Sequence, residues 1–145
     1  MNYWMTVFNE VTWPQFLDMS SKVCAYTEPR GKRVPNIDVG DQIICYIAKA
    51  KSWGGVLRVS GQRFSDDKRI FSGGPYPIRI PVEPIYLATL EQAIPMDQLE
   101  GKLSFFPSGG SGKDWAPYVR NSPRKFHVPD AEAVVAEFQV QREAA

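Results

Sequence analysis

The sequence predicts an α+β fold, in which a small, strongly curved sheet or barrel is flanked by helices. The opening segment Tyr3–Phe8 carries bulky side chains on both faces, which is typical of a strand covered on both sides. Further apolar strands are predicted at residues 42–48 and 53–64, and apolar residues recur with a helical period near the C-terminus. The sequence has no internal repeat, so we expect a single domain over residues 1–145.

Composition and charge limit the classes of function. A chain of 145 residues with 43% hydrophobic residues can bury one ordinary core. The net charge of +1 argues against a protein that coats nucleic acid by bulk electrostatics, but it allows local basic patches. Cys24 and Cys45 form no CxxC motif and His127 is the only histidine, so we expect free thiols, no metal and no cofactor. Because no signal peptide or membrane-spanning stretch is recognisable, we expect a cytoplasmic protein.

The opening strand is predicted to lead directly into a short helix. Thr12 and Gln15 have the spacing of a capping box, and Pro14 lies in the first turn, where its missing N–H does no harm. Asn9 is a polar residue at the end of a buried strand and next to aromatic residues, so it is a candidate pocket residue. Its alternative role is a strand-end turn or a helix cap.

The middle of the chain is predicted to alternate strands with polar loops. Residues 22–36 are predicted to form a long loop, and residues 65–75 a polar loop that carries Phe71. Residues 76–87 contain three prolines, which remove ladder donors and therefore favour an edge strand or an irregular barrel strand. A first basic patch in this part of the chain consists of Lys22, Arg30, Lys32 and Arg33.

The C-terminal part is predicted to contain one helical turn at residues 95–99, a short strand at 104–106, a flexible loop at 107–114 and an amphipathic helix that begins at Pro129. A second basic patch precedes this helix. Together the patches could hold phosphates on both sides of a pocket, by contacts that position a nucleic acid without specifying its sequence. The alternative is an ordinary solvated surface. The second patch consists of Lys113, Arg120, Arg124 and Lys125.

Taken together, these segments resemble EVE domains, which belong to the PUA-like superfamily and are relatives of YTH domains. The resemblance rests on the NYW opening, the VGD turn that leads into QIICYI, the GGVLRVS strand, the RIF motif and the YPIRIPVEPI run. Each motif is short, but their order and spacing cover nearly the whole chain. The resemblance implies a PUA-like curved sheet or small barrel with flanking helices, and a pocket for a base flipped out of nucleic acid.

The resemblance also implies which residues form the pocket. Cys24 and Ala25 occupy the place where many relatives carry a Trp-Gly or Trp-Ser pair, so this chain lacks one stacking indole. In single-strand binders such a stacking face is worth ~1–3 kcal/mol per base. Tyr26 or Trp53 could replace it. The implied pocket residues are Asn9, Cys24, Ala25, Tyr26, Trp53, Phe71 as an aromatic wall and Trp115 at the rim.

We therefore expect a non-enzymatic module that accommodates a flipped and modified base, for example a methylated one, in DNA or RNA. One alternative is an enzyme of a related barrel fold, a nucleoside or amide hydrolase using Cys24, Lys22 or His127, although no GxSxG or HExxH motif is present. Another is an adaptor that recruits a separate nuclease or ATPase. The SGGSGKD run at residues 108–114 does not fit a P-loop, because Pro107 and Asp114 stand at required positions.

Overall fold

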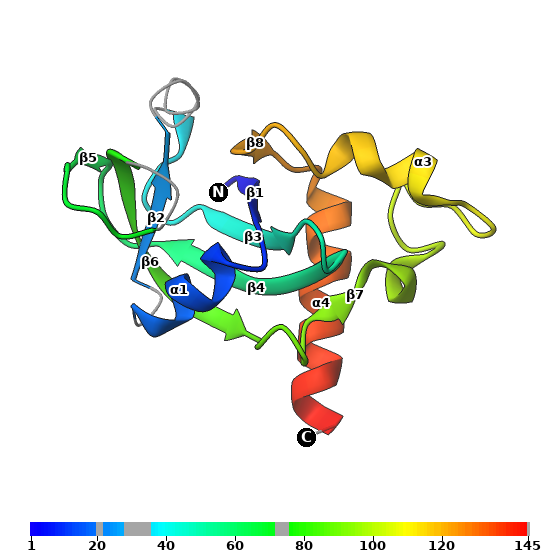
Figure 1. Ribbon diagram of the computed structural model, residues 1–145. Coiled ribbons are helices and arrows are strands. Elements are labelled where there is room, and N and C mark those ends of the chain that lie inside the picture. The colour runs from blue at the N-terminus through cyan, green and yellow to red at the C-terminus, as the bar shows by residue number, and fades with distance from the viewer. Residues whose placement is uncertain (20–21, 28–35, 72–75, 145) are drawn as a thin grey trace.

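The computed structural model describes residues 1–19, 22–27, 36–71 and 76–144. The predicted α+β class is confirmed: strands form most of the core, and helices cover it (Figure 1). The strands are β1 (Tyr3–Phe8), β2 (Val23–Tyr26), β3 (Gln42–Ile47), β4 (Ser52–Val59), β5 (Phe64–Ser65), β6 (Ile78–Leu87), β7 (Ile94–Pro95) and β8 (Arg124–Lys125). The helices are α1 (Thr12–Asp18), α3 (Gly112–Trp115) and α4 (Val128–Ala144), with 3-10 turns η2 (Met96–Leu99) and η3 (Ala116–Tyr118).

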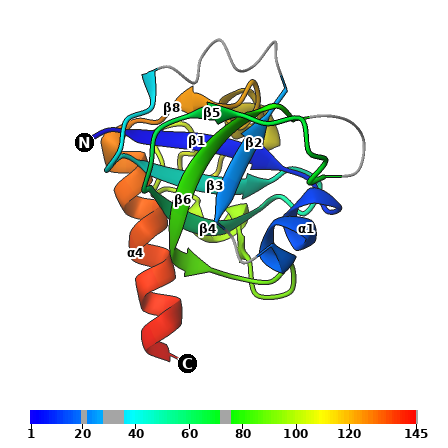
Figure 2. The same cartoon turned by 90° about the vertical axis from the view of Figure 1, so that its left-hand side faces the viewer.

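The sheet has the order β2–β6–β4–β3–β1–β8, in which β3 and β1 run parallel. Side chains of β3 alternate between two cores, as the period of a strand requires. Ile44 and Tyr46 belong to the core beneath α4, while Ile43 and Ile47 belong to the core beneath α1. Figure 1 and Figure 2 both show α4 and α1 at separate flanks of the sheet. Strand β1 divides in the same way, with Met5 in the core beneath α4 and Trp4 and Phe8 in the core beneath α1, so the predicted strand with two covered faces is confirmed.

The sheet curls back on itself, so that strands from its two sides meet. β2 and β1 are separated in the sheet order by β6, β4 and β3. Nevertheless the Oγ1 atom of Thr6 on β1 lies 2.7 Å from the phenolic oxygen of Tyr26 on β2, and both residues are buried. In Figure 2, β2 and β6 cross over β1 and β3. The core beneath α1 is thus the interior of a half-closed barrel.

Trp13 of α1 closes one end of this interior. Its Nε1 donates a hydrogen bond to the carbonyl oxygen of Ala88 at 2.9 Å, and the indole lies flat enough on β4 that a Cβ at Gly54 would come within 2.8 Å of it. A larger residue at Gly54 would therefore push the indole away. The indole of Trp13 thus occupies the space beside the backbone at Gly54 and Gly55.

Two local predictions are wrong, and one of the two alternatives for residues 76–87 is excluded. Part of the predicted loop at 22–36 is strand β2, which pairs antiparallel with β6. Strand β6 is not an edge strand, because it lies between β2 and β4; its irregularity is confirmed by a register shift opposite Pro84. The predicted strand at 104–106 is a turn with one isolated bridge between Leu103 and Phe106.

Within the described part of the chain, no helix is long and apolar enough to span a membrane.

Candidate functional site

A cavity of about 360 Å³ lies where β1 ends and β2 passes beside it, and we call it the Asn9 cavity. It is built from segments that are far apart in the sequence: the end of β1 with the start of α1, β2, the loop before β6, and the segment before β8. Its volume falls within the usual range for sites that hold small ligands. The lining residues are 6–9, Thr12, 25–27, Ala48, Phe71, Tyr76 and 119–122.

The hydroxyl pair of Thr6 and Tyr26 contributes the buried polar groups of the cavity. Burial raises the pKa of the Tyr26 phenol well above its ordinary value, so the hydroxyl stays neutral. Tyr26 also forms a hydrogen bond with the buried Cys24 thiol, so its hydroxyl group has two partners within the protein. These contacts hold the hydroxyl in place at the cavity wall.

The aromatic side of the cavity is formed by Phe71 and Tyr76, whose rings stand perpendicular with centroids 5.2 Å apart. Phe71 also meets Phe8 edge to face at 6.5 Å. Although Phe71 was predicted to lie in a polar loop, only 3% of it is exposed, because these two neighbours enclose it. Such a ring is held in one place before any ligand arrives.

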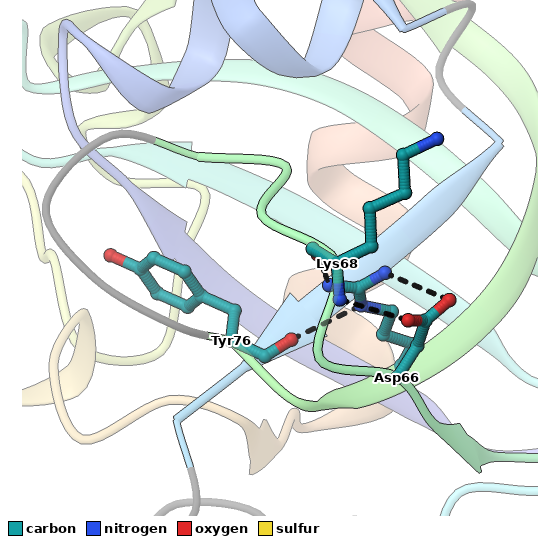
Figure 3. A network of polar contacts seen from close by, with 4 residues as sticks. Asp66, Lys68 and Tyr76 are labelled. Carbon is teal, nitrogen blue, oxygen red and sulfur yellow. Dashed lines mark hydrogen bonds and ion pairs between the residues drawn. The ribbon is translucent and has the colours of Figure 1, made fainter.

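Arg79 of β6 holds the segment that carries this aromatic side. The arginine is buried, its Nε donates to the carbonyl oxygen of Tyr76 at 3.2 Å, and its Nη2 donates to the carbonyl oxygen of Lys68. Its Nη1 lies 3.4 Å from Oδ2 of Asp66. Figure 3 shows Asp66, Lys68 and Tyr76 arranged around these contacts. One buried guanidinium thus fixes both ends of the loop that bears Phe71.

Asn9 both caps α1 and lines the cavity. Its Oδ1 accepts hydrogen bonds from the backbone N–H groups of Val11 and Thr12, each at 2.8 Å. Thr12 returns the contact, because its Oγ1 accepts from the backbone N–H of Asn9 at 3.0 Å. The predicted capping-box partner of Thr12 was Gln15, so this prediction is wrong by one turn. Two backbone donors fix which amide atom is oxygen, and the Nδ2 donors of Asn9 form no hydrogen bond within the described residues.

Of the implied pocket residues, Asn9, Ala25, Tyr26 and Phe71 line the cavity, whereas Cys24, Trp53 and Trp115 do not. Cys24 is completely buried in the core beneath α1. Trp53 and Trp115 lie in the core beneath α4, where their rings pack around Tyr46 at 4.9 and 6.2 Å. These three residues therefore pack in the two cores and lie outside the Asn9 cavity.

The basic residues are distributed differently from the prediction. Arg120 lines the Asn9 cavity and is exposed. Arg124 is anchored, since its Nη1 donates to the carbonyl oxygens of Pro117 at 3.0 Å and of Arg120 at 3.5 Å. Lys125 and Lys22 are exposed. Arg30, Lys32 and Arg33 lie outside the described residues.

Sequence reasoning missed several cavity residues. Nothing in the sequence marked Thr6 as a partner of Tyr26, which lies in a segment that was predicted to be a loop. Asn121, which has a φ of 62°, and Ser122 belong to an Asn-Ser-Pro run that could have indicated a turn.

Within the described residues, no group of three or more His, Cys, Asp or Glu side chains could hold a metal ion.

Comparisons with known proteins identify the fold. No protein-family model and no curated protein sequence matches the chain. Among solved structures, the Mmi1 YTH domain matches with a TM-score of 0.69 and 7% identity, over 99% of this chain and 78% of that one. The YTH domain of Zygosaccharomyces rouxii MRB1 in complex with N6-methyladenosine RNA matches with a TM-score of 0.65 and 13% identity, over 94% and 87%.

The chain has a YTH-like fold. A hypothetical protein from Leishmania major has the same fold, with a TM-score of 0.65 and 11% identity over 98% of this chain and 97% of that one. At these identities the likeness concerns the fold, which agrees with the PUA-like curved sheet that the sequence predicted. Membership of the EVE family stays a prediction.

Proposed function

We propose that this chain is a non-enzymatic nucleic-acid-binding module that takes a flipped, modified base into the Asn9 cavity. One observation carries the proposal: a preformed cavity combines a fixed aromatic side with buried hydrogen-bonding groups, in a fold shared with a YTH domain solved in complex with N6-methyladenosine RNA. A flipped base needs this combination, because stacking holds its face while hydrogen bonds at its edge discriminate between bases.

The polar groups suggest how a base edge is recognised. Asn9 offers the donors of Nδ2, since its Oδ1 is committed to the helix cap. A base edge with acceptor nitrogen or oxygen atoms therefore fits these groups, and the exposed guanidinium of Arg120 can meet a phosphate at the mouth of the cavity.

The enzyme alternative receives no support from Cys24. Burial raises the pKa of its thiol to about 12, so it is protonated at neutral pH, and it does not line the Asn9 cavity. A recruited nuclease or ATPase is compatible with the proposal, because such an effector would act on the nucleic acid that this module binds.

The test is a binding panel with short single- and double-stranded DNA and RNA. The oligonucleotides carry plain cytosine or adenine, 5-methyl-, 5-hydroxymethyl- or N4-methylcytosine, or N6-methyladenine, at two salt concentrations. We expect selective binding of one modified base that survives the higher salt. Binding that ignores the modification and collapses with salt would contradict the proposal, because it would reflect phosphate contact alone.

A further inference from the structure

A second hollow of about 310 Å³ lies next to the Asn9 cavity, on the other side of the segment that precedes β8. We call it the Tyr118 groove. The residues that line it include Phe105, Tyr118, Arg124, Lys125, His127 and Asp130. None of them lines the Asn9 cavity, so the groove is a separate site.

The groove presents a layered planar surface. The rings of Phe105 and Tyr118 stack at 4.7 Å with an angle of 9° between their planes. The guanidinium carbon of Arg124 lies over the Tyr118 ring, 5.9 Å from its centroid. Phe105 is buried and Tyr118 is 46% exposed, so the layer is rooted in the core and reaches the surface. Aromatic rings and arginine planes are the surfaces on which unpaired bases stack.

The arginine of this layer is fixed in place, unlike an ordinary solvated side chain. Its Nη1 donates to the carbonyl oxygens of Pro117 and Arg120, which lie on either side of Tyr118 in the sequence. Because the same short segment supplies the ring and anchors the guanidinium, the layer does not have to be assembled when a ligand binds. Little conformational entropy is then lost on binding.

The charge of the groove favours an anionic ligand. Arg124 and the exposed Lys125 are cationic, while the acid of the groove, Asp130, is buried and already satisfied. Asp130 accepts hydrogen bonds from the backbone N–H and the hydroxyl of Ser104, both at 2.6 Å, and from Nδ1 of His127 at 3.3 Å. This last contact leaves Nε2 of the exposed His127 ring for a ligand.

The two sites lie along one path. Strand β8 runs antiparallel to β1, with Arg124 beside Met5 and Lys125 beside Trp4, whereas Asn9 lies just beyond the other end of β1. Asn9 follows Met5 by four residue steps along the strand, which corresponds to about 13 Å. A strand that places one base in the Asn9 cavity therefore reaches the Tyr118 groove within a few nucleotides.

We propose that the Tyr118 groove binds a second nucleotide of the same nucleic-acid strand, near the one whose base enters the Asn9 cavity. Its base stacks on the layer of Tyr118 and Arg124, and its phosphate pairs with Lys125. The inference rests on the proposed function for the choice of ligand. An acidic peptide would satisfy the charges but would leave the planar layer unused, so a nucleotide fits the groove better.

The experiment separates the two sites by the size of the ligand. Binding is measured for N6-methyladenosine 5′-monophosphate, for RNA heptanucleotides with a central N6-methyladenosine between uridines, and for the same RNA with abasic flanking positions. A parallel DNA series carries 5-methylcytosine. Variants are Tyr118→Ala, Tyr118→Phe and Arg124→Ala, with Arg58→Ala as the matched control because Arg58 is an exposed arginine on a different part of the sheet, paired with Glu83.

We expect flanking bases to increase the affinity of the wild-type protein roughly five- to a hundredfold over abasic flanks, the range of one stacked base. Tyr118→Ala should remove most of this gain without changing the affinity for the monophosphate. Arg124→Ala should reduce the gain, and Tyr118→Phe and Arg58→Ala should keep it. A gain that Tyr118→Ala leaves unchanged, or no gain in the wild-type protein, would overturn the inference.

Failure of the proposed function gives a different result. In that case the monophosphate does not bind and methylation has no effect, while a Tyr118-dependent gain from flanking bases still supports the groove. If neither series binds at all, both proposals are contradicted. As a second measurement, 5-iodouridine at the flanking positions should crosslink to Tyr118 or His127; crosslinks confined to other surfaces would contradict the groove.

Discussion

The hydroxyl groups of Thr6 and Tyr26 lie 2.7 Å apart and connect β1 to β2, two strands that are separated by three others in the sheet order and share no backbone pairing. The contact is buried, and it lines the Asn9 cavity. Closure of the half-barrel and the shape of the cavity therefore depend on the same pair of atoms.

Tyr26→Phe should lower the free energy of unfolding by about 1–3 kcal/mol, because it leaves the Thr6 hydroxyl buried without its partner. Urea denaturation measures this loss. The double variant Thr6→Val with Tyr26→Phe should recover part of it, since removing both partners avoids an unsatisfied group. Tyr118→Phe, at an exposed tyrosine, is the control and should change stability little. Equal stability of Tyr26→Phe and the wild-type protein would show that the contact does not hold the barrel.

Arg79→Met should loosen the segment that bears Phe71. Its loss leaves the carbonyl oxygens of Lys68 and Tyr76 without their donor, so we expect about 1–3 kcal/mol lower stability and faster hydrogen exchange around Phe71. The affinity for the modified base should fall with it.

Arg58→Met is the matched control for this change. Arg58 pairs with Glu83 on the surface, where both side chains are more than half exposed, so its loss should cost no more than about 1 kcal/mol. If hydrogen exchange around Phe71 is equally fast in the Arg79→Met and Arg58→Met variants, then Arg79 does not position this segment.

The sequence predicts the strands and helices whose periodicity is local. The two-faced pattern of Tyr3–Phe8 and the apolar run of β3 are both found in the structure, as is the helix α4. Strand β2 was not predicted, because its four residues show little periodicity of their own. Its strand conformation depends on pairing with β6, more than fifty residues away. Pairing partners of this kind are not visible in a local window.

The candidate site was predicted in part for the same reason. Asn9 and Phe71 could be found from their local context, since one ends a strand and the other lies in a polar loop. Trp53 was also a candidate pocket residue, because it could replace the missing indole. The register of β4, however, places its side chain in the core beneath α4. Tyr76 and the turn at Asn121 reach the cavity through the curl of the sheet, which no local pattern encodes.

Cys24→Trp tests the corrected place of Cys24. If this position were a cage wall, the indole common in relatives would improve binding. Because Cys24 is completely buried, we expect an overpacked core and a loss of stability of at least about 1–3 kcal/mol, without a gain in affinity. Thermal unfolding and a binding titration measure the two effects. Tighter binding with unchanged stability would return Cys24 to the pocket.

Stability should fall in acid partly through Asp41. Burial alone would raise the pKa of this carboxyl, but hydrogen bonds from the N–H groups of Asn2, Asp38 and the Trp4 indole outweigh burial and lower the pKa below its ordinary 3.8. A depressed pKa in the folded state contributes stability above pH ~4, and this contribution is lost as pH falls further. Asp41→Asn should therefore be less stable at neutral pH and lose less stability in acid.

The acid limb of denaturation curves, recorded between pH 7 and 2, checks this expectation. Asp67→Asn removes an exposed carboxyl and serves as the control. An Asp41→Asn variant whose stability falls as steeply in acid as that of the wild-type protein would contradict the role of Asp41.

The most direct test of base binding in the Asn9 cavity is to fill this cavity with a larger side chain. Ala25 lines the cavity and is half-buried, whereas Ala136 is exposed on α4 and serves as the matched control. We compare Ala25→Trp and Ala136→Trp with the wild-type protein for binding to the preferred modified oligonucleotide and its plain counterpart. We expect Ala25→Trp to abolish the preference for the modified base while the folded state persists, and Ala136→Trp to keep the preference. A folded Ala25→Trp protein that still prefers the modified base would show that the base binds outside the Asn9 cavity.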